Sequence, residues 1–219
     1  MWFANRPPEP VIPRLRHGKI LGMAEDTATI SGTMPSRGIK PYLLIQSGLF
    51  LAGFLIGFFL PVPWTIEMLG ELVEKFGPHN KLSPTWLFLF ILANNATKAF
   101  FILLLGIMFG ILPVVSVFLN GYVLGIVCLW AVGKAGIASA MKAVIPHGVL
   151  EIPTLIISTA YGLWLGVVFA RRISQRDWKG AGGQVRHAVT IYFKVAFPLF
   201  ILAALIETFL IISMGGVSR

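Results

Sequence analysis

Long apolar runs alternate with short polar connections along most of the chain. Five of these runs are long enough to span a bilayer: 42–60, 86–110, 113–133, 147–170 and 188–213. Because an α-helix rises about 1.5 Å per residue, each run can cross a hydrocarbon core about 30 Å thick. The pattern predicts an all-α, polytopic membrane protein whose five transmembrane helices form one bundle over residues 41–214.

Residues 64–77 follow a different, amphipathic pattern. Apolar side chains recur there at helical spacing, while Glu67, Glu71 and Glu74 occupy much of the remaining face. Such a segment predicts a short helix lying at the outer membrane surface. The alternative interpretation is a connecting helix that simply packs on the bundle.

The composition agrees with a membrane protein. Of 219 residues, 56% are hydrophobic and only 12% are charged, which lies outside the usual range of soluble domains. The formal net charge of +9 does not indicate a nucleic-acid partner, because the basic residues collect beside the apolar runs. The lipid bilayer is therefore the expected surrounding, and the single cysteine, Cys128, excludes an intramolecular disulfide.

Residues 1–40 are rich in proline and basic side chains, which predicts a partly ordered cytoplasmic segment without a cleavable signal peptide. This segment and the loop after the fourth run carry most of the 18 Lys and Arg residues. Positive loops remain on the cytoplasmic side of a membrane. We therefore expect a multi-pass protein of the cell membrane with a cytoplasmic amino terminus and an external carboxyl terminus.

Polar side chains interrupt the start of the fourth run. A helix beginning at Pro146 would place His147 and Glu151 on one face, which Thr154 and Ser158 continue. Ionisable groups inside a membrane are costly, so this stripe favours a functional site such as a proton relay, a cation site or part of a catalytic centre. The alternative is that His147 stays at the interface and Glu151 caps the helix start.

Further polar residues lie within the other apolar runs, and we expect them to converge with this stripe in the outer half of the bundle. Lys98 is expected to pair with a carboxylate, and Glu207 in the fifth run could meet Glu151. Alternatively, the asparagines hold helices together and Lys98 reaches an interface along its apolar stem. The expected intramembrane polar site comprises Asn94, Asn95, Lys98, Asn120, His147, Glu151, Thr154, Ser158 and Glu207.

No cofactor or metal site is expected. His147 and Glu151 have workable ligand spacing, but there is no HExxH motif, and His17, His79 and His187 fall in predicted polar connections. Phosphate-binding glycine motifs and a nucleophile elbow are also missing from the sequence. These observations favour a protein that is not an enzyme.

Each of the first four runs contains two glycines spaced four residues apart. Such pairs allow helix backbones to approach closely in lipid, either within one chain or between copies in a homo-oligomer. The predicted helix-packing residues are Gly53, Gly57, Gly106, Gly110, Gly121, Gly125, Gly162 and Gly166.

Several of these residues together form a recognisable ordered set: Asn94-Asn95, Gly106, Gly110, Pro113, Asn120-Gly121, Gly125, Pro146-His147-Gly148, Glu151, Gly162 and Gly166. With this set, residues 42–213 resemble the stage II sporulation protein M family of integral membrane proteins. The resemblance implies a multi-span component that, in endospore formers, acts with partner membrane proteins and peptidoglycan-degrading enzymes during engulfment. Members also occur in organisms that do not sporulate, and the resemblance supplies no catalytic role for His147 or Glu151.

Three hypotheses about function follow. The leading one is a non-enzymatic scaffold or subunit of a membrane assembly, stabilised by a buried polar network and bound to membrane-protein partners. The second is a channel or carrier in which the polar residues line a route for a proton, cation or small polar solute. The third, an intramembrane hydrolase, lacks an evident nucleophile.

Overall fold

A computed structural model describes residues 38–76 and 82–213, so nearly all of the predicted cytoplasmic segment 1–40 lies outside it. The described residues form helices and no strands. Five segments are long and apolar enough to cross a membrane, which confirms the predicted fold class. The elements are α2 (Lys40–Phe59), α3 (Pro63–Phe76), α4 (Pro84–Leu105), α5 (Ile111–Gln175), α6 (Ala181–Ile191), the π-helix η2 (Tyr192–Ala196) and α7 (Phe197–Ser213).

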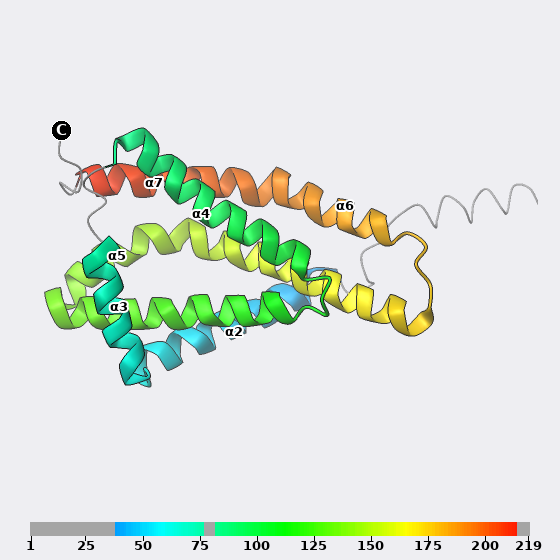
Figure 1. The fold of residues 1–219 in the computed structure, drawn as a ribbon, viewed down its shortest axis with the longest axis horizontal. Helices are drawn as coiled ribbons and strands as arrows, with labels where there is room; N and C mark the ends of the chain where they lie inside the picture. The colour runs from blue at the N-terminus through cyan, green and yellow to red at the C-terminus, as the bar shows by residue number, and fades with distance from the viewer. Residues whose placement is uncertain (1–37, 77–81, 214–219) are drawn as a thin grey trace, which may run out of the picture.

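The long helices run side by side, and α3 crosses them at one end of the bundle (Figure 1). We call this the α3 end; α2 finishes there and α4 begins there. The opposite end, called the α6 end, holds the 106–110 connection and the 176–180 connection. α2 starts at the α6 end and α7 finishes at the α3 end, as five crossings require (Figure 1).

The third and fourth spans are two halves of α5. Residues 134–145 lie between the third and fourth predicted runs and connect the two spans, but they are helical except at Gly136, where φ is 77° and ψ is 167°. Only glycine adopts this conformation readily, so the chain reverses at a single residue. The fourth span therefore extends a helix that begins before Pro146, and Pro146 is not a helix start.

The fifth span begins earlier than the apolar run indicates. It comprises α6, η2 and α7, from Ala181 to Ser213, so His187 lies within a helix and not in a polar connection. Pro198 explains the π-helix, because it cannot donate a hydrogen bond to the carbonyl of Lys194. The backbone accommodates this loss with a wider turn, in which the Phe197 amide donates to the Tyr192 carbonyl.

Two glycine pairs face each other where α2 crosses the first half of α5. A Cβ atom on Gly53 would overlap the Phe118 carbonyl, and one on Gly121 would overlap the Phe50 carbonyl. Gly57 and Gly125 repeat this relation one turn further along. The backbones are therefore in direct contact, at a separation that no other residue type permits.

The other glycine pairs bring the end of α4 onto the second half of α5. A Cβ on Gly106 would overlap the Gly162 carbonyl, and one on Gly166 would overlap the backbone of Gly110. Gly110 has a φ of 72° and terminates the tight connection between α4 and α5. All four pairs thus make contacts within one chain, so they do not provide a free surface for a homo-oligomer.

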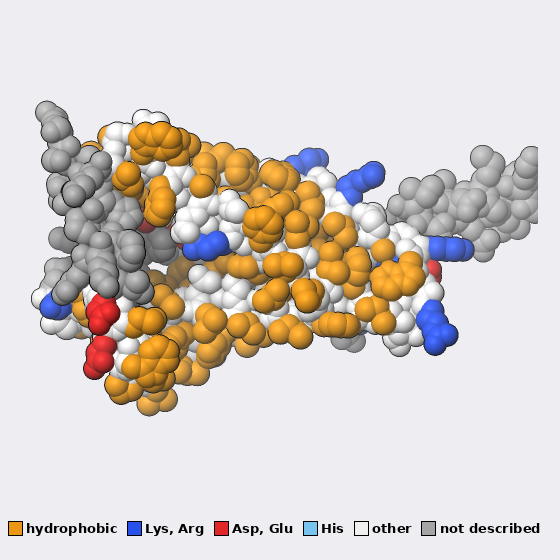
Figure 2. Space-filling model, in the orientation of Figure 1, with side chains coloured by type: hydrophobic (Ala, Val, Ile, Leu, Met, Phe, Trp, Pro, Cys, Tyr) orange, Lys and Arg blue, Asp and Glu red, His pale blue; other side chains and the backbone are white. Residues whose placement is uncertain are grey.

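Most charged side chains gather at the two ends of the bundle, and the face between them is largely apolar, although a basic side chain also lies on it (Figure 2). The exposed acidic residues Glu67 and Glu71 lie on α3. The α6 end carries Arg171, Arg176, Lys179 and Arg186. This division matches the two polar boundaries of a membrane-spanning bundle.

Candidate intramembrane polar site

A small polar pocket lies where α4, both halves of α5 and α7 meet. Its volume is about 110 Å³, and it is lined by Asn95, Lys98, Ala99, Ile102, Ser116, Asn120, Glu151, Leu155 and Phe200. Lys98 lies roughly 10 Å from the nearer end of α4, so the pocket is within the depth of the hydrocarbon core. An amine, a carboxyl group and two amides from separate helical segments therefore share one cavity inside the bundle.

Local hydrogen bonds orient the amide groups. The Asn120 Nδ2 donates to the Ser116 carbonyl at 2.8 Å, and Ser116 Oγ is 3.4 Å away. On α4, Asn94 Nδ2 donates to Asn95 Oδ1 at 3.2 Å. These bonds hold the asparagines close to their own helices while Asn95 and Asn120 still line the pocket.

Several of the predicted site residues are not in this pocket. Asn94 is exposed beside it, and Glu207 lies roughly 10 Å along α7 from Phe200, which does line it. The structure therefore does not bring Glu207 into the pocket with Glu151. The side chain of His147 lies outside the described part of the chain.

Thr154 and Ser158 are buried but also do not line the pocket. Their hydroxyl groups donate to carbonyls one turn earlier in the same helix, from Thr154 to Leu150 at 2.6 Å and from Ser158 to Thr154 at 2.9 Å. A hydroxyl that bonds to its own helix can be buried in an apolar bundle at little cost. The predicted polar stripe therefore divides into two parts. Glu151 lines the pocket, whereas Thr154 and Ser158 pack in the bundle with their hydroxyl groups bonded to their own helix.

Two buried interhelical hydrogen bonds were not predicted from the sequence. Gln46 on α2 is fully buried, and its Nε2 donates to the Thr159 carbonyl at 3.1 Å. The Tyr192 hydroxyl, at the start of η2, donates to the Ala96 carbonyl at 2.6 Å. Gln46 could have been found as a polar residue inside an apolar run, whereas tyrosine gives no such signal.

Tyr161, Trp164 and His187 form a second buried cluster nearer the α6 end. The Trp164 and His187 ring centres are 5.8 Å apart, and Tyr161 packs edge-on against Trp164 at 6.1 Å. Within the described chain, Trp164 Nε1 and His187 Nε2 are buried without a hydrogen-bond partner. Sequence patterns did not indicate this cluster, because they placed His187 in a polar connection.

No group of three or more His, Cys, Asp or Glu side chains in the described part of the chain could hold a metal ion. The polar pocket instead combines donors and acceptors that suit hydrogen bonding to a polar group or a few water molecules. Its lining can therefore form hydrogen bonds with a polar group that lies at the pocket.

The bundle that contains this pocket matches a known protein family. The family model for stage II sporulation protein M matches residues 47–210. The chain belongs to this family. The matched range includes all the pocket residues and all four glycine pairs of this stage II sporulation protein M family member. No match was found among curated proteins or among solved structures.

Proposed function

We propose that the chain is a non-enzymatic subunit of a membrane assembly and that a transmembrane helix of a partner protein binds over the polar pocket. The observation that carries this proposal is the exposure of Asn94, Lys98 and Asn120 within a membrane-spanning bundle. Polar groups that face hydrocarbon lose their hydrogen bonds with water, at a cost of about 1–3 kcal/mol each. A partner helix that supplies polar groups at this place removes that cost.

Asparagine is suited to such an interface. Its side chain has two N–H donors and a carbonyl acceptor, so Asn120 can bond to Ser116 and to a second helix together. Asparagine side chains also associate helices in membranes. The glycine pairs are not available for contact with a partner helix, because they already pack helices of this chain against each other.

The partner should be lost when these amides are removed. We expect Asn94→Leu and Asn120→Leu together to abolish co-purification of a membrane protein with the tagged full chain from native membranes. Phe101→Leu, at an exposed apolar position on α4, is the matched control and should leave the complex intact. Thermal melting in detergent will show whether each variant is folded, and a folded double variant that retains the same partner contradicts the proposal.

A second function is favoured by one feature of the pocket, the presence of Lys98 and Glu151 in a single cavity of about 110 Å³. An amine and a carboxyl group in a membrane are typical of proton or ion pathways. Purified protein in sealed vesicles distinguishes the two functions. Our proposal predicts no flux, whereas pH- or ion-dependent flux that Glu151→Gln abolishes would replace it with a channel or carrier.

We propose further that the α6 end faces the cytoplasm, which gives the orientation expected from the sequence. The α6 end is basic and the α3 end is acidic, in agreement with the positive-inside rule. The family name associates its members with sporulation. For this chain we propose a role in assemblies that remodel the cell envelope.

A further inference from the structure

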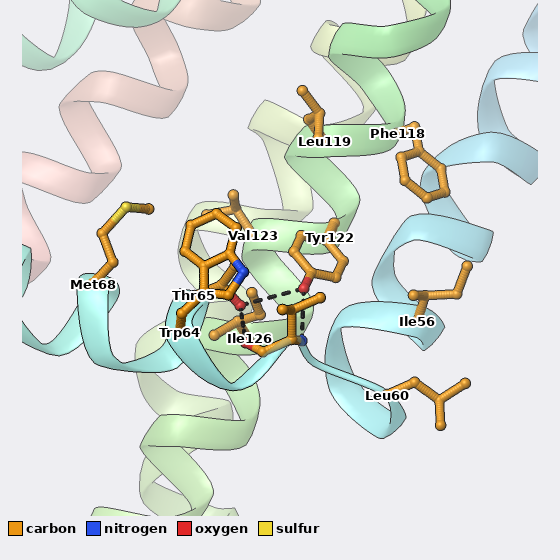
Figure 3. Close-up of a pocket in the computed structure, with 11 residues that line it drawn as sticks. Ile56, Leu60, Trp64, Thr65, Met68, Phe118, Leu119, Tyr122, Val123 and Ile126 are labelled. Atoms are coloured by element: carbon orange, nitrogen blue, oxygen red, sulfur yellow. Dashed lines mark hydrogen bonds between the residues drawn. The ribbon is translucent and has the colours of Figure 1, made fainter.

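An apolar groove lies beneath α3, at the membrane boundary of the bundle (Figure 3). Its volume is about 470 Å³, within the usual range of sites for small ligands. The walls come from the end of α2, the turn into α3, α3 itself and the first half of α5. The lining residues are Ile56, Leu60, Val62, Trp64, Thr65, Met68, Phe118, Leu119, Tyr122, Val123 and Ile126.

Polar groups of three wall residues, Val62, Thr65 and Tyr122, bond to one another. The Val62 amide donates to the Tyr122 hydroxyl at 3.0 Å, and that hydroxyl lies 3.3 Å from Thr65 Oγ1. Thr65 Oγ1 in turn donates to the Val62 carbonyl at 2.6 Å, and dashed lines mark these bonds beside Thr65 and Tyr122 in Figure 3. This arrangement fixes the turn between α2 and α3, so the groove is preformed and suits an apolar occupant.

The groove follows α5 from Ile126, beside α3, to Phe118 deeper in the bundle (Figure 3). Eight residues of helix correspond to roughly 12 Å. The occupant therefore begins at the membrane boundary and extends toward the membrane centre. An acyl chain of a lipid in the adjacent leaflet has this direction, and its headgroup would lie at α3.

The rim beside α3 is acidic. Glu67 and Glu71 are exposed, and each lies three residues from Trp64 or Met68, so both carboxylates border the apolar stripe that covers the groove. Thr65 points from the other side of α3 toward Tyr122. Trp64, which is 61% exposed, has the position at which tryptophan anchors proteins at the bilayer interface.

We propose that this groove is a binding site for a phospholipid with a primary amine in its headgroup, such as phosphatidylethanolamine. One acyl chain occupies the groove, and the ammonium group lies beside Glu67 and Glu71. The complementary charge of the rim favours this lipid over anionic phospholipids. The site lies on different residues from the polar pocket and does not depend on the partner assembly.

Lipid retained by the purified full chain tests the proposal. The protein is extracted from vesicles that contain equal amounts of phosphatidylethanolamine and phosphatidylglycerol, and bound lipid is measured by mass spectrometry. We expect about threefold enrichment of phosphatidylethanolamine, because the interaction free energy of a solvent-screened surface charge pair corresponds to a preference of about this size. Glu67→Gln with Glu71→Gln should remove this preference while lipid remains bound.

Filling the groove should remove the lipid itself. Val123→Phe places a ring in the groove without changing Tyr122, and it should reduce the retained phosphatidylethanolamine. Val115→Phe is the matched control, since Val115 is similarly exposed on α5 but does not line the groove. Melting temperatures check that both variants fold.

Three outcomes would overturn the proposal: no preference in the wild-type protein, equal lipid retention by the two valine variants, or a photo-crosslinker at Val123 that captures a protein segment and no lipid. The last outcome would identify the groove as a docking site for a partner peptide.

Discussion

At the residue scale, individual polar side chains join helices that are otherwise held by apolar and backbone contacts. Gln46 connects α2 to the second half of α5, and Tyr192 connects η2 to α4. In lipid the hydrophobic effect does not bring helices together, so packing and such hydrogen bonds contribute more to their association.

Tyr192→Phe should destabilise the bundle by about 1 kcal/mol, because it removes a buried interhelical hydrogen bond and leaves the Ala96 carbonyl with fewer donors. Tyr161→Phe is the control, since the Tyr161 ring packs mainly on Trp164 and His187. Unfolding in mixed micelles measures both variants. Equal stability of the two would show that the Tyr192 hydroxyl contributes nothing.

At the element scale, glycine determines how closely helices approach and where the chain reverses. Gly53→Ala should cost about 1–3 kcal/mol, because the added methyl group overlaps the Phe118 carbonyl and separates α2 from α5. Gly48→Ala on the same helix meets nothing within 4 Å and should be neutral or slightly stabilising. Thermal melting of the two variants in detergent separates these effects, and equal melting temperatures would contradict the close packing.

Gly136→Ala should also destabilise the protein, but for a different reason. There is open space around Gly136, so the cost of about 1–3 kcal/mol comes from a backbone conformation that alanine disfavours. Gly133→Ala lies in the same helix with the same open space and ordinary helical dihedrals. If both variants melt at the same temperature, the chain reverses elsewhere.

Sequence patterns predicted the spans well because apolar length follows directly from membrane thickness. They placed a connection over 134–145 but did not reveal that it is helical and that a single residue, Gly136, makes the reversal. They also placed the start of the fifth span too late, because the polar residues Gln184 and His187 precede the apolar run, although Gln184 is buried in the bundle. The cost of those polar side chains depends on contacts with other helices, which periodicity does not reveal.

At the scale of the whole molecule, the candidate site could be predicted only in part. The intramembrane depth of Asn95, Lys98, Asn120 and Glu151 could be predicted from the sequence, and the structure places these four in one cavity. Glu207 could not be placed, because that depends on the rotation and tilt of α7. Thr154 and Ser158 share a predicted face with Glu151, but their bonds to their own helix give them a different role.

The whole molecule also has an asymmetric surface. Acidic α3 stands at one end, the basic α6 end stands at the other, and polar side chains are exposed between them on a largely apolar face (Figure 2). An isolated bundle would place these polar groups against lipid, which is costly. We propose that a helix of a partner protein covers these polar groups in a membrane assembly and so removes the cost of their exposure to lipid.

Photo-crosslinking in native membranes tests this central claim most directly. A photoreactive residue is placed at Asn120 and, as a control, at Leu51, which is 55% exposed on α2. We predict that the probe at position 120 yields an adduct with a second membrane protein, while the probe at position 51 yields lipid adducts. Lipid adducts alone at both positions would contradict the proposal that a partner helix covers the polar pocket.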